Sequence, residues 1–175
     1  LAAEPKGRPE PIAPDAADVY AEADKLSATV AEALRRAQVP HVVALCSQGA
    51  HLPEGTGVVA TLHGFEQALL TTGLPLTRLR PAYFMESWLP FAGVALETGQ
   101  MPALLDPMDR AIPTVSVRDV GAIAADFLLH PQPGVANLMG PAEYSDQDAA
   151  MLLAGILGRD VTLAPVLADQ VAGLH

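Results

Sequence analysis

Two short apolar segments, at 41–46 and 75–80, each follow a stretch with helical periodicity, and this alternation constrains the fold more than any other feature of the sequence. In the first stretch, apolar side chains recur at steps of three and four up to Pro40, which predicts an amphipathic helix. A second helix is predicted for 58–72. Helices that alternate with short strands predict a parallel sheet joined by crossover helices.

The first predicted helix follows a proline-rich segment, residues 1–14, which we interpret as a loop or linker. Asp15 is the predicted N-cap, because its carboxylate can accept hydrogen bonds from free backbone N–H groups. One apolar stripe of this helix is expected to face the core: Val19, Ala23, Leu26, Val30, Leu34 and Ala37.

The second half of the sequence mixes helical and strand patterns. Capping boxes formed by Ser116 with Asp119 and by Ser145 with Asp148 predict the start of two helices. The predicted elements are a helix at 83–96, strands at 112–117, 135–140 and 160–165, and helices at 117–130 and 146–157. We therefore predict an α/β protein with a small lobe of mixed elements beside the sheet.

Composition and charge argue against several classes of function. The formal net charge is −10 and no basic stripe is visible, so binding to nucleic acid or to an anionic membrane surface is not expected. The single cysteine, Cys46, permits neither an internal disulfide nor a cysteine-based metal site, and the histidines lack metal-ligand spacing, so no metal is predicted. No apolar run approaches the roughly 20 residues of a membrane span, and no signal-peptide pattern is present, so the cytoplasm is the expected compartment.

Arg78 and Arg80 stand at alternate positions of the second apolar segment, so both side chains are expected on one face of the strand. A partly buried guanidinium needs a carboxylate or carbonyl partner. Glu66, on the preceding helix, and Glu86, after the strand, are the candidate partners. Two other interpretations of Glu66 stay open: a carboxylate that orients His63, or a residue on a solvated helix face.

Three segments stand in a characteristic order: "VPHVVALCSQGAH", "LHGFEQALLTTGLPLTRLRPAYFMES" and "IPTVSVRDVGAIAADFLL". Together they resemble the NmrA-like group of atypical short-chain dehydrogenases/reductases, over about residues 15–165. The resemblance implies the C-terminal part of a Rossmann-like parallel sheet with crossover helices, plus a small mixed α/β substrate lobe. It implies a single NAD(P)-binding domain, in which residues 15–82 form the Rossmann part and residues 83–175 belong mostly to the substrate lobe.

The family's Gly-rich turn, which holds the cofactor pyrophosphate, is not found in this sequence. Residues 1–46 match the family's fourth helix and fifth strand. At roughly 30 residues per β-α-β unit, about 70 residues would precede them. We therefore expect an N-terminally truncated member of the family. The choice between NAD and NADP stays open, because it is determined after the second strand.

Ser47 and His63 are the candidate catalytic residues. The resemblance places Ser47 near the nicotinamide, where its hydroxyl could bind a substrate carbonyl or the cofactor; the alternative is a turn residue that bonds its own backbone. The Tyr-x-x-x-Lys pair of this superfamily is absent. His63 lies beside the expected tyrosine position and could donate a proton or bind the cofactor ribose; the alternative is a structural histidine.

The resemblance also implies contacts at the carboxyl ends of the two strands, where such sheets bind ligands. The expected cofactor-binding residues are Ser47, Gln48, His63, Pro81, Tyr83 and Phe84. The expected substrate pocket is formed by Tyr83, Phe84 and Glu86. For Tyr83 and Phe84 the alternative is that they simply begin a core helix.

Two functions are compatible with these features. The first is an NAD(P)H-dependent oxidoreductase that acts on a small carbonyl or quinone compound, with a dinucleotide and a small-molecule substrate as its partners. The second is a non-catalytic NAD(P) redox sensor that acts through a protein partner. The frequency of reductases among related proteins favours the first, whereas the missing Tyr-x-x-x-Lys pair and the acidic composition favour the second.

Overall fold

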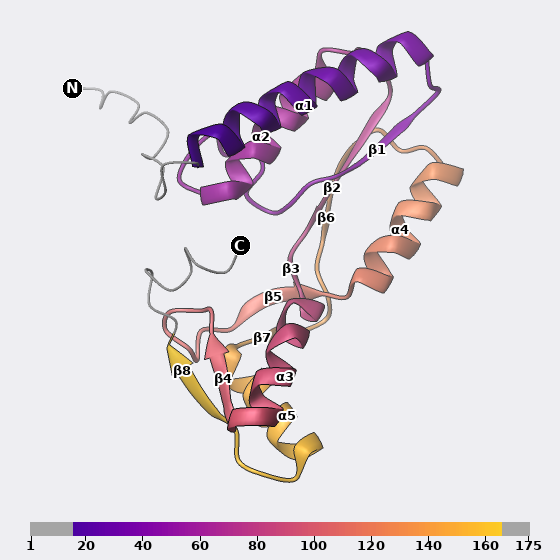
Figure 1. Ribbon diagram of the computed structural model, residues 1–175. Coiled ribbons are helices and arrows are strands. Elements are labelled where there is room, and N and C mark those ends of the chain that lie inside the picture. The colour runs from indigo at the N-terminus through magenta and orange to yellow at the C-terminus, as the bar shows by residue number, and fades with distance from the viewer. Residues whose placement is uncertain (1–15, 166–175) are drawn as a thin grey trace, which may run out of the picture. The chain divides into compact units, whose positions relative to one another are not determined.

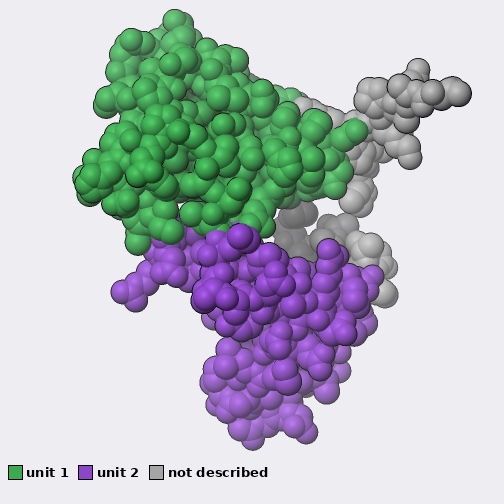
Figure 2. Space-filling view, turned by 180° about the vertical axis from the view of Figure 1, so that it is seen from behind, with its two compact units in different colours: residues 1–81, 121–138 green, residues 82–120, 139–175 purple. Residues whose placement is uncertain are grey.

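Figure 1 shows the computed structural model, which describes residues 16–165. The predicted linker at 1–14 and the predicted cap at Asp15 lie outside the described residues. The chain divides into two compact units, which Figure 2 shows in different colours.

Among the described residues, unit 1 holds 16–81 together with 121–138, and unit 2 holds 82–120 together with 139–165. The chain therefore leaves unit 1 after β2 and returns to it within α4 (Val117–Leu129).

Unit 1 is built on a three-stranded parallel sheet in the order β1-β2-β6. The strands are β1 (Val42–Leu45), β2 (Leu76–Pro81) and β6 (Gly134–Leu138). In the register of the sheet, Ala44 pairs with Arg78, and Arg78 pairs with Val135. The prediction of an α/β protein with parallel strands and crossover helices is confirmed.

Two helices pack on this sheet beside one another, α1 (Ala16–Ala37) and α2 (Ala60–Leu70), as Figure 1 shows. Gly64 of α2 faces α1 closely, because a β-carbon at this position would lie 3.0 Å from a carboxylate oxygen of Asp24, whose side chain would have to shift. The buried core of unit 1 is small and apolar; it contains Ala44, Cys46, Ala50, Leu69 and Leu76.

The buried face of α1 differs in part from the predicted stripe. Val30 and Leu34 pack against the core of unit 1 as predicted. Val19 and Leu26 are exposed, however, whereas Ser27 is buried. The buried Ser27 and Ala31 lie one helical turn apart, so the buried face of α1 runs through these residues and not through Leu26. Ser27 tolerates burial because its hydroxyl donates to the backbone carbonyl four residues earlier.

Unit 2 combines two small sheets with two helices. Strands β3 (Tyr83–Phe84), β5 (Ile112–Val115) and β7 (Glu143–Tyr144) form one sheet, and β4 (Gln100–Ala103) pairs in parallel with β8 (Thr162–Pro165). Helices α3 (Leu89–Thr98) and α5 (Asp146–Leu157) complete the unit. Its buried core contains Trp88, Ala95, Met101 and Ala150.

The predicted helix at 83–96 begins six residues too early. Tyr83 and Phe84 are extended and pair with β5, and Phe84 has φ −74° and ψ 125°. A short 3-10 helix follows, and the α-helix begins only at Leu89. Pro90 explains this start, since the first turn of a helix is where a missing backbone N–H has no cost. The alternative in which Tyr83 and Phe84 begin a core helix is therefore wrong.

The helices α4 and α5 begin directly after Ser116 and Ser145, as the capping patterns predict. The Ser145 hydroxyl accepts from the backbone N–H of Asp148 at 3.1 Å, and the Asp148 carboxylate accepts from the backbone N–H of Ser145 at 2.8 Å. The Ser116 hydroxyl likewise accepts from the backbone N–H of Asp119 at 3.1 Å. Both serines thus satisfy N–H groups that have no partner inside the helix.

The segment after β6 passes very close to β5 in unit 2, and this contact requires a glycine. The backbone N–H of Gly140 donates to the carbonyl oxygen of Thr114 at 2.6 Å. A β-carbon on Gly140 would lie 2.8 Å from the same oxygen, and a backbone oxygen cannot move aside as a side chain can.

We expect Gly140→Ala to lower the free energy of unfolding by about 1–3 kcal/mol through overpacking. The matched control is Gly155→Ala, since Gly155 is exposed on α5 and no atom lies within 4 Å of the place that an added methyl group would take. This control should raise stability by up to about 1 kcal/mol, because alanine favours the helix. Urea denaturation of both variants measures the effects; equal effects of the two substitutions would contradict the packing argument.

Candidate functional site

The loop after β1 is fastened to the end of β2. The backbone N–H of Cys46 donates to the Leu79 carbonyl at 2.7 Å, and that of Gln48 donates to the Pro81 carbonyl at 3.0 Å. These bonds extend the β1–β2 pairing and bring Ser47 and Gln48 to the carboxyl end of the sheet, next to Pro81. This is the edge at which open parallel sheets bind their ligands.

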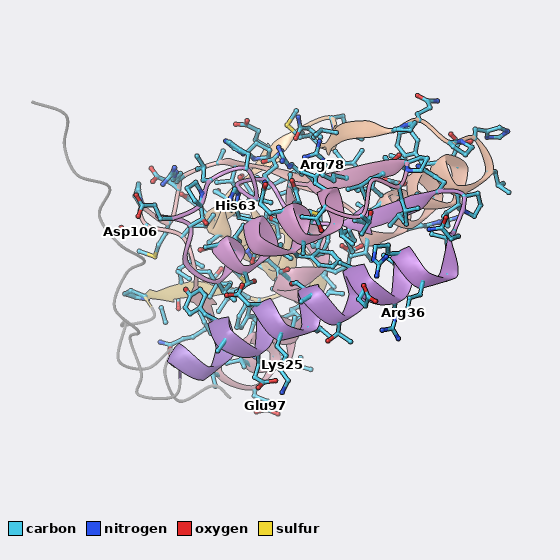
Figure 3. The ribbon with its side chains drawn as sticks, turned by 90° about the horizontal axis from the view of Figure 1, so that it is seen from above. Lys25, Arg36, His63, Arg78, Glu97 and Asp106 are labelled. Carbon is cyan, nitrogen blue, oxygen red and sulfur yellow. The ribbon has the colours of Figure 1, made fainter. Side chains whose placement is uncertain are left out.

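His63 lies in the first turn of α2 and is labelled in Figure 3. Its Nδ1 atom lies 3.1 Å from the carbonyl oxygen of Ala50, in the loop that carries Ser47. A carbonyl oxygen can only accept, so Nδ1 carries a hydrogen, and Nε2 is the nitrogen that can take up or release a proton. No hydrogen bond joins the side chains of Ser47 and His63 in the part of the chain that the structure describes.

Glu66, one turn after His63, is the centre of a buried charged cluster. Only 1% of its side chain is exposed. Arg80 donates to both of its oxygens, from Nε at 2.8 Å and from Nη2 at 2.6 Å. Arg78 approaches the same carboxylate less closely, at 3.4 Å. The prediction that the two arginines share a face and take Glu66 as their partner is confirmed, and the solvated-face interpretation of Glu66 is wrong.

The cluster fixes the protonation of its members. Burial alone would raise the pKa of the Glu66 carboxyl, but the hydrogen bonds from Arg80 outweigh burial and hold the pKa below its ordinary value. Burial raises the pKa of the Cys46 thiol to about 12, and the neighbouring Glu66 carboxylate adds to this shift. Cys46 is therefore a protonated thiol near neutral pH and not a nucleophile.

We expect Glu66→Gln to lower the free energy of unfolding by about 3 kcal/mol, because it leaves two partly buried guanidinium groups without their counter-charge. The pKa of Glu66 is lowered in the folded state, so its stabilisation is present above the ordinary glutamate pKa of about 4.3 and is lost as the pH falls through and below that value. The difference between wild type and variant should therefore shrink in acid.

Chemical denaturation between pH 3 and pH 7 (roughly the span of glutamate titration) measures this dependence. The matched control is Glu32→Gln, because Glu32 also bonds two arginines, Arg35 and Arg36, but on the exposed surface of α1. This control should leave stability nearly unchanged. A Glu66→Gln variant that is as stable as the control would contradict the structural role of the buried carboxylate.

In unit 2, Tyr83 packs on the side chain of Trp88. The two ring centroids lie 5.2 Å apart and the planes are inclined at 54°, a favourable tilted arrangement. Burial raises the pKa of the Tyr83 hydroxyl above its ordinary value, so this hydroxyl stays protonated near neutral pH. Tyr83 and Phe84 are both partly buried, and Tyr83 belongs to the apolar surroundings of the core of unit 2.

Asp146 is a second buried carboxylate, with 0% of the residue exposed. Its oxygens accept three hydrogen bonds of 2.7 Å, from the indole Nε1 of Trp88 and from the backbone N–H groups of Leu104 and Leu105. The backbone N–H of the next residue, Gln147, donates to the Met108 carbonyl at 3.2 Å. The start of α5 therefore fixes the loop 104–108 in one conformation.

A cavity of about 370 Å³ lies against this loop and is lined by residues 103–108 and Pro165. Its volume falls within the range of roughly 300–1,000 Å³ that is usual for small-molecule sites. The lining is mainly apolar, and Asp106, labelled in Figure 3, is its charged residue.

Glu86 has a different role from that of an arginine partner. Both of its carboxylate oxygens lie 3.1 Å from the backbone N–H of Val117, the first residue of α4. A carboxylate here neutralises the partial positive charge of the helix N-terminus. Of the two candidate partners, Glu66 provides the contacts to Arg78 and Arg80, and the Glu86 carboxylate is bound to the N-terminus of α4.

Trp88 and Asp146 are the functional-site candidates that the sequence analysis missed. Asp146 follows the N-cap serine in "SDQD", a place where an acidic side chain ordinarily faces solvent and the helix dipole. Asp146 is buried because the loop 104–108 packs against it, and no local sequence pattern predicts this tertiary contact. The single tryptophan of the sequence was the one available signal, since a buried indole N–H needs an acceptor.

We expect Asp146→Asn to loosen the 104–108 loop, because an amide has only one acceptor oxygen and its NH₂ group would face at least one of the three N–H donors. The loss of unfolding free energy should be about 1–3 kcal/mol. Trp88 is the only tryptophan, so its fluorescence should change in the folded state. The exposed Asp109→Asn serves as control; identical emission spectra for both variants and wild type would contradict this account.

Two features are absent from residues 16–165. No group of three or more histidine, cysteine, aspartate or glutamate side chains could hold a metal ion there. No helix in the same range is long and apolar enough to cross a membrane.

The chain is similar to several known proteins. No protein-family model matches it. It is 25% identical over 150 residues to the NAD(P)H azoreductase of Xenophilus azovorans, an alignment that covers 83% of this chain and 51% of that protein.

Among solved structures, the NADPH-dependent quinone oxidoreductase QOR2 of Escherichia coli, in complex with NADPH, matches with a TM-score of 0.74 and 24% identity, over 85% of this chain and 52% of that one. The triphenylmethane reductase of Citrobacter sp., in complex with NADP(H), matches with a TM-score of 0.71 and 21% identity, over 86% of this chain and 53% of that one. The chain thus spans about half the length of the proteins that it matches.

These likenesses establish the fold class. The protein has an α/β fold with a Rossmann-like parallel sheet, of the kind found in NAD(P)-binding reductases. Membership of the NmrA-like group and the roles of the individual site residues stay predictions.

Proposed function

We propose that the intact protein carrying this chain is an NAD(P)H-dependent oxidoreductase of the NmrA-like group that reduces a small quinone or other carbonyl compound. The observation that carries the proposal is the position of His63, whose Nδ1 is held by Ala50 and whose Nε2 is left to exchange protons. The likeness to an azoreductase and to the fold of a quinone oxidoreductase supports the reaction class.

The residues at the strand ends fit a nicotinamide dinucleotide by the chemistry of their donors. Ser47 offers a hydroxyl, Gln48 an amide and His63 an imidazole, all near the carboxyl end of the parallel sheet. Pro81, Tyr83 and Phe84 are the further proposed cofactor contacts. A bound NADPH or NADH would supply the hydride.

The proton for the reduced oxygen is assigned to His63. The imidazolium form of His63 donates its Nε2 proton to the substrate oxygen, and the Nδ1–H bond to Ala50 keeps the resulting neutral ring in the tautomer whose Nε2 can be protonated again. Ser47 donates a hydrogen bond to the same carbonyl oxygen and orients it. Cys46 takes no part, since its thiol stays protonated.

The substrate pocket is assigned to unit 2. Tyr83 and Phe84 provide its aromatic wall, and Glu86 contributes by fixing the start of α4. The cavity beside the loop 104–108 is lined by none of Tyr83, Phe84 and Glu86, so its mainly apolar lining is a separate place in unit 2 that would suit the ring of a quinone. Asp146 holds that lining in place.

We expect His63→Gln to lower kcat/KM for quinone reduction about 100-fold, the lower range for loss of a general acid. Dinucleotide affinity should change by less than about threefold, a fraction of a kcal/mol, because glutamine keeps a hydrogen-bond donor for the cofactor. Steady-state kinetics and a direct NADPH titration measure the two effects. Gln67→Ala, an exposed substitution on the same helix, is the control. Full activity of the His63→Gln variant would exclude His63 as the general acid.

A second function, a redox sensor that binds NAD(P) and signals through a protein partner, is favoured by one observation. The Tyr-x-x-x-Lys pair that performs proton transfer in the superfamily is missing. Saturable dinucleotide binding without turnover of any quinone, azo or carbonyl compound would support the sensor and argue against the reductase.

A further inference from the structure

One face of the sheet of unit 1 carries two arginines, Arg78 and Arg80, and the carboxylate of Glu66 neutralises only one of them. Arg78 and Arg80 of β2 pair in register with Val135 and Asn137 of β6, and residues in register on parallel strands project to the same face. In Figure 3, α2 lies between α1 and Arg78. Helix α2 covers Arg80 through Glu66, whereas Val135 and Asn137 on the outer strand are exposed.

The charges of the cluster do not cancel. Arg80 occupies both oxygens of Glu66 with short hydrogen bonds of 2.8 and 2.6 Å, which leaves Arg78 a single contact of 3.4 Å. Two guanidinium groups stand against one carboxylate, and the neighbouring Cys46 thiol is neutral. The surplus of one positive charge belongs to Arg78, on a chain whose net charge is −10.

Arg78 is also short of hydrogen bonds. Its Nε–H is buried and has no partner among the described residues, and its only ion-pair contact there is the long one to Glu66. About a fifth of the side chain, 20%, is exposed, so solvent reaches part of the guanidinium. Arginine residues that make so few of their five possible donations are rare inside proteins, and an unpaired buried donor calls for a ligand or water.

We propose that Arg78 and Asn137 bind a small organic monocarboxylate. A planar carboxylate matches the flat fork of a guanidinium, and its charge matches the single uncompensated charge of the cluster. Asn137 lies two positions beyond Val135 on the adjacent strand and presents an exposed amide that can donate to the second oxygen. Val135, the register partner of Arg78, is exposed on the same face and gives an apolar group of the ligand a surface to cover.

The test is ¹⁹F NMR titration of the intact protein with 4-fluorobenzoate. We expect saturable binding that Arg78→Met weakens about tenfold or more, the effect of losing a charged hydrogen bond. Arg78→Met should fold, because Arg80 still neutralises Glu66. Asn137→Ala, a substitution at an exposed site, should also weaken binding and keeps the test valid if Arg78→Met is unstable. The control Arg35→Met removes an exposed arginine of α1 and should leave binding unchanged.

Two further probes define the ligand. The neutral 4-fluorobenzamide should not bind, and inorganic phosphate should compete more weakly than benzoate. Equal binding of 4-fluorobenzoate to wild type and both site variants, absence of binding to wild type, or tighter binding of phosphate or of the amide would each overturn the proposal. The outcome is independent of NADPH oxidation, since the titration contains no nicotinamide cofactor.

Discussion

The ion pair between Glu66 and Arg80 is the constraint on which the organisation of unit 1 depends. It joins the middle of α2 to the carboxyl-terminal half of β2 in an environment where an unpaired charge would be costly. Because α2 is fixed in this way, His63 reaches the loop after β1 and bonds Ala50. The position of the candidate acid thus follows from a contact that takes no part in chemistry.

Unit 2 uses a buried carboxylate differently. Asp146 has no cationic partner among its contacts within residues 16–165; three N–H donors satisfy it, and two of them belong to the loop beside the cavity. A carboxylate that accepts several N–H bonds can remain buried without a counter-ion. Glu66 therefore organises a sheet through charge, whereas Asp146 organises a loop through hydrogen bonds. Each carboxylate holds a candidate site in place without itself contacting a ligand.

The sequence was informative where the local pattern and the tertiary structure agree. Arg78 and Arg80 stand at alternate positions of β2, so both needed an acidic partner on the same face. Glu66, on the helix that directly precedes this strand, was the available residue. The Ser145 capping box is equally local. Tyr83 and Phe84 were assigned to a helix because their pairing with Thr114 and Val115 depends on residues about thirty positions away. The burial of Asp146 depends on a similar long-range contact.

The central claim is that the intact protein, which contains this Rossmann-like chain, uses a nicotinamide dinucleotide as reductant. The most direct test is titration of the intact protein with NADPH and with NADH, followed by the fluorescence of the reduced nicotinamide. The account predicts saturable binding of at least one of them, seen as a change in the nicotinamide emission, and loss of that emission when an added quinone oxidises the bound cofactor. Failure to bind either dinucleotide would contradict it and would leave the reductase-like fold without the reductase function.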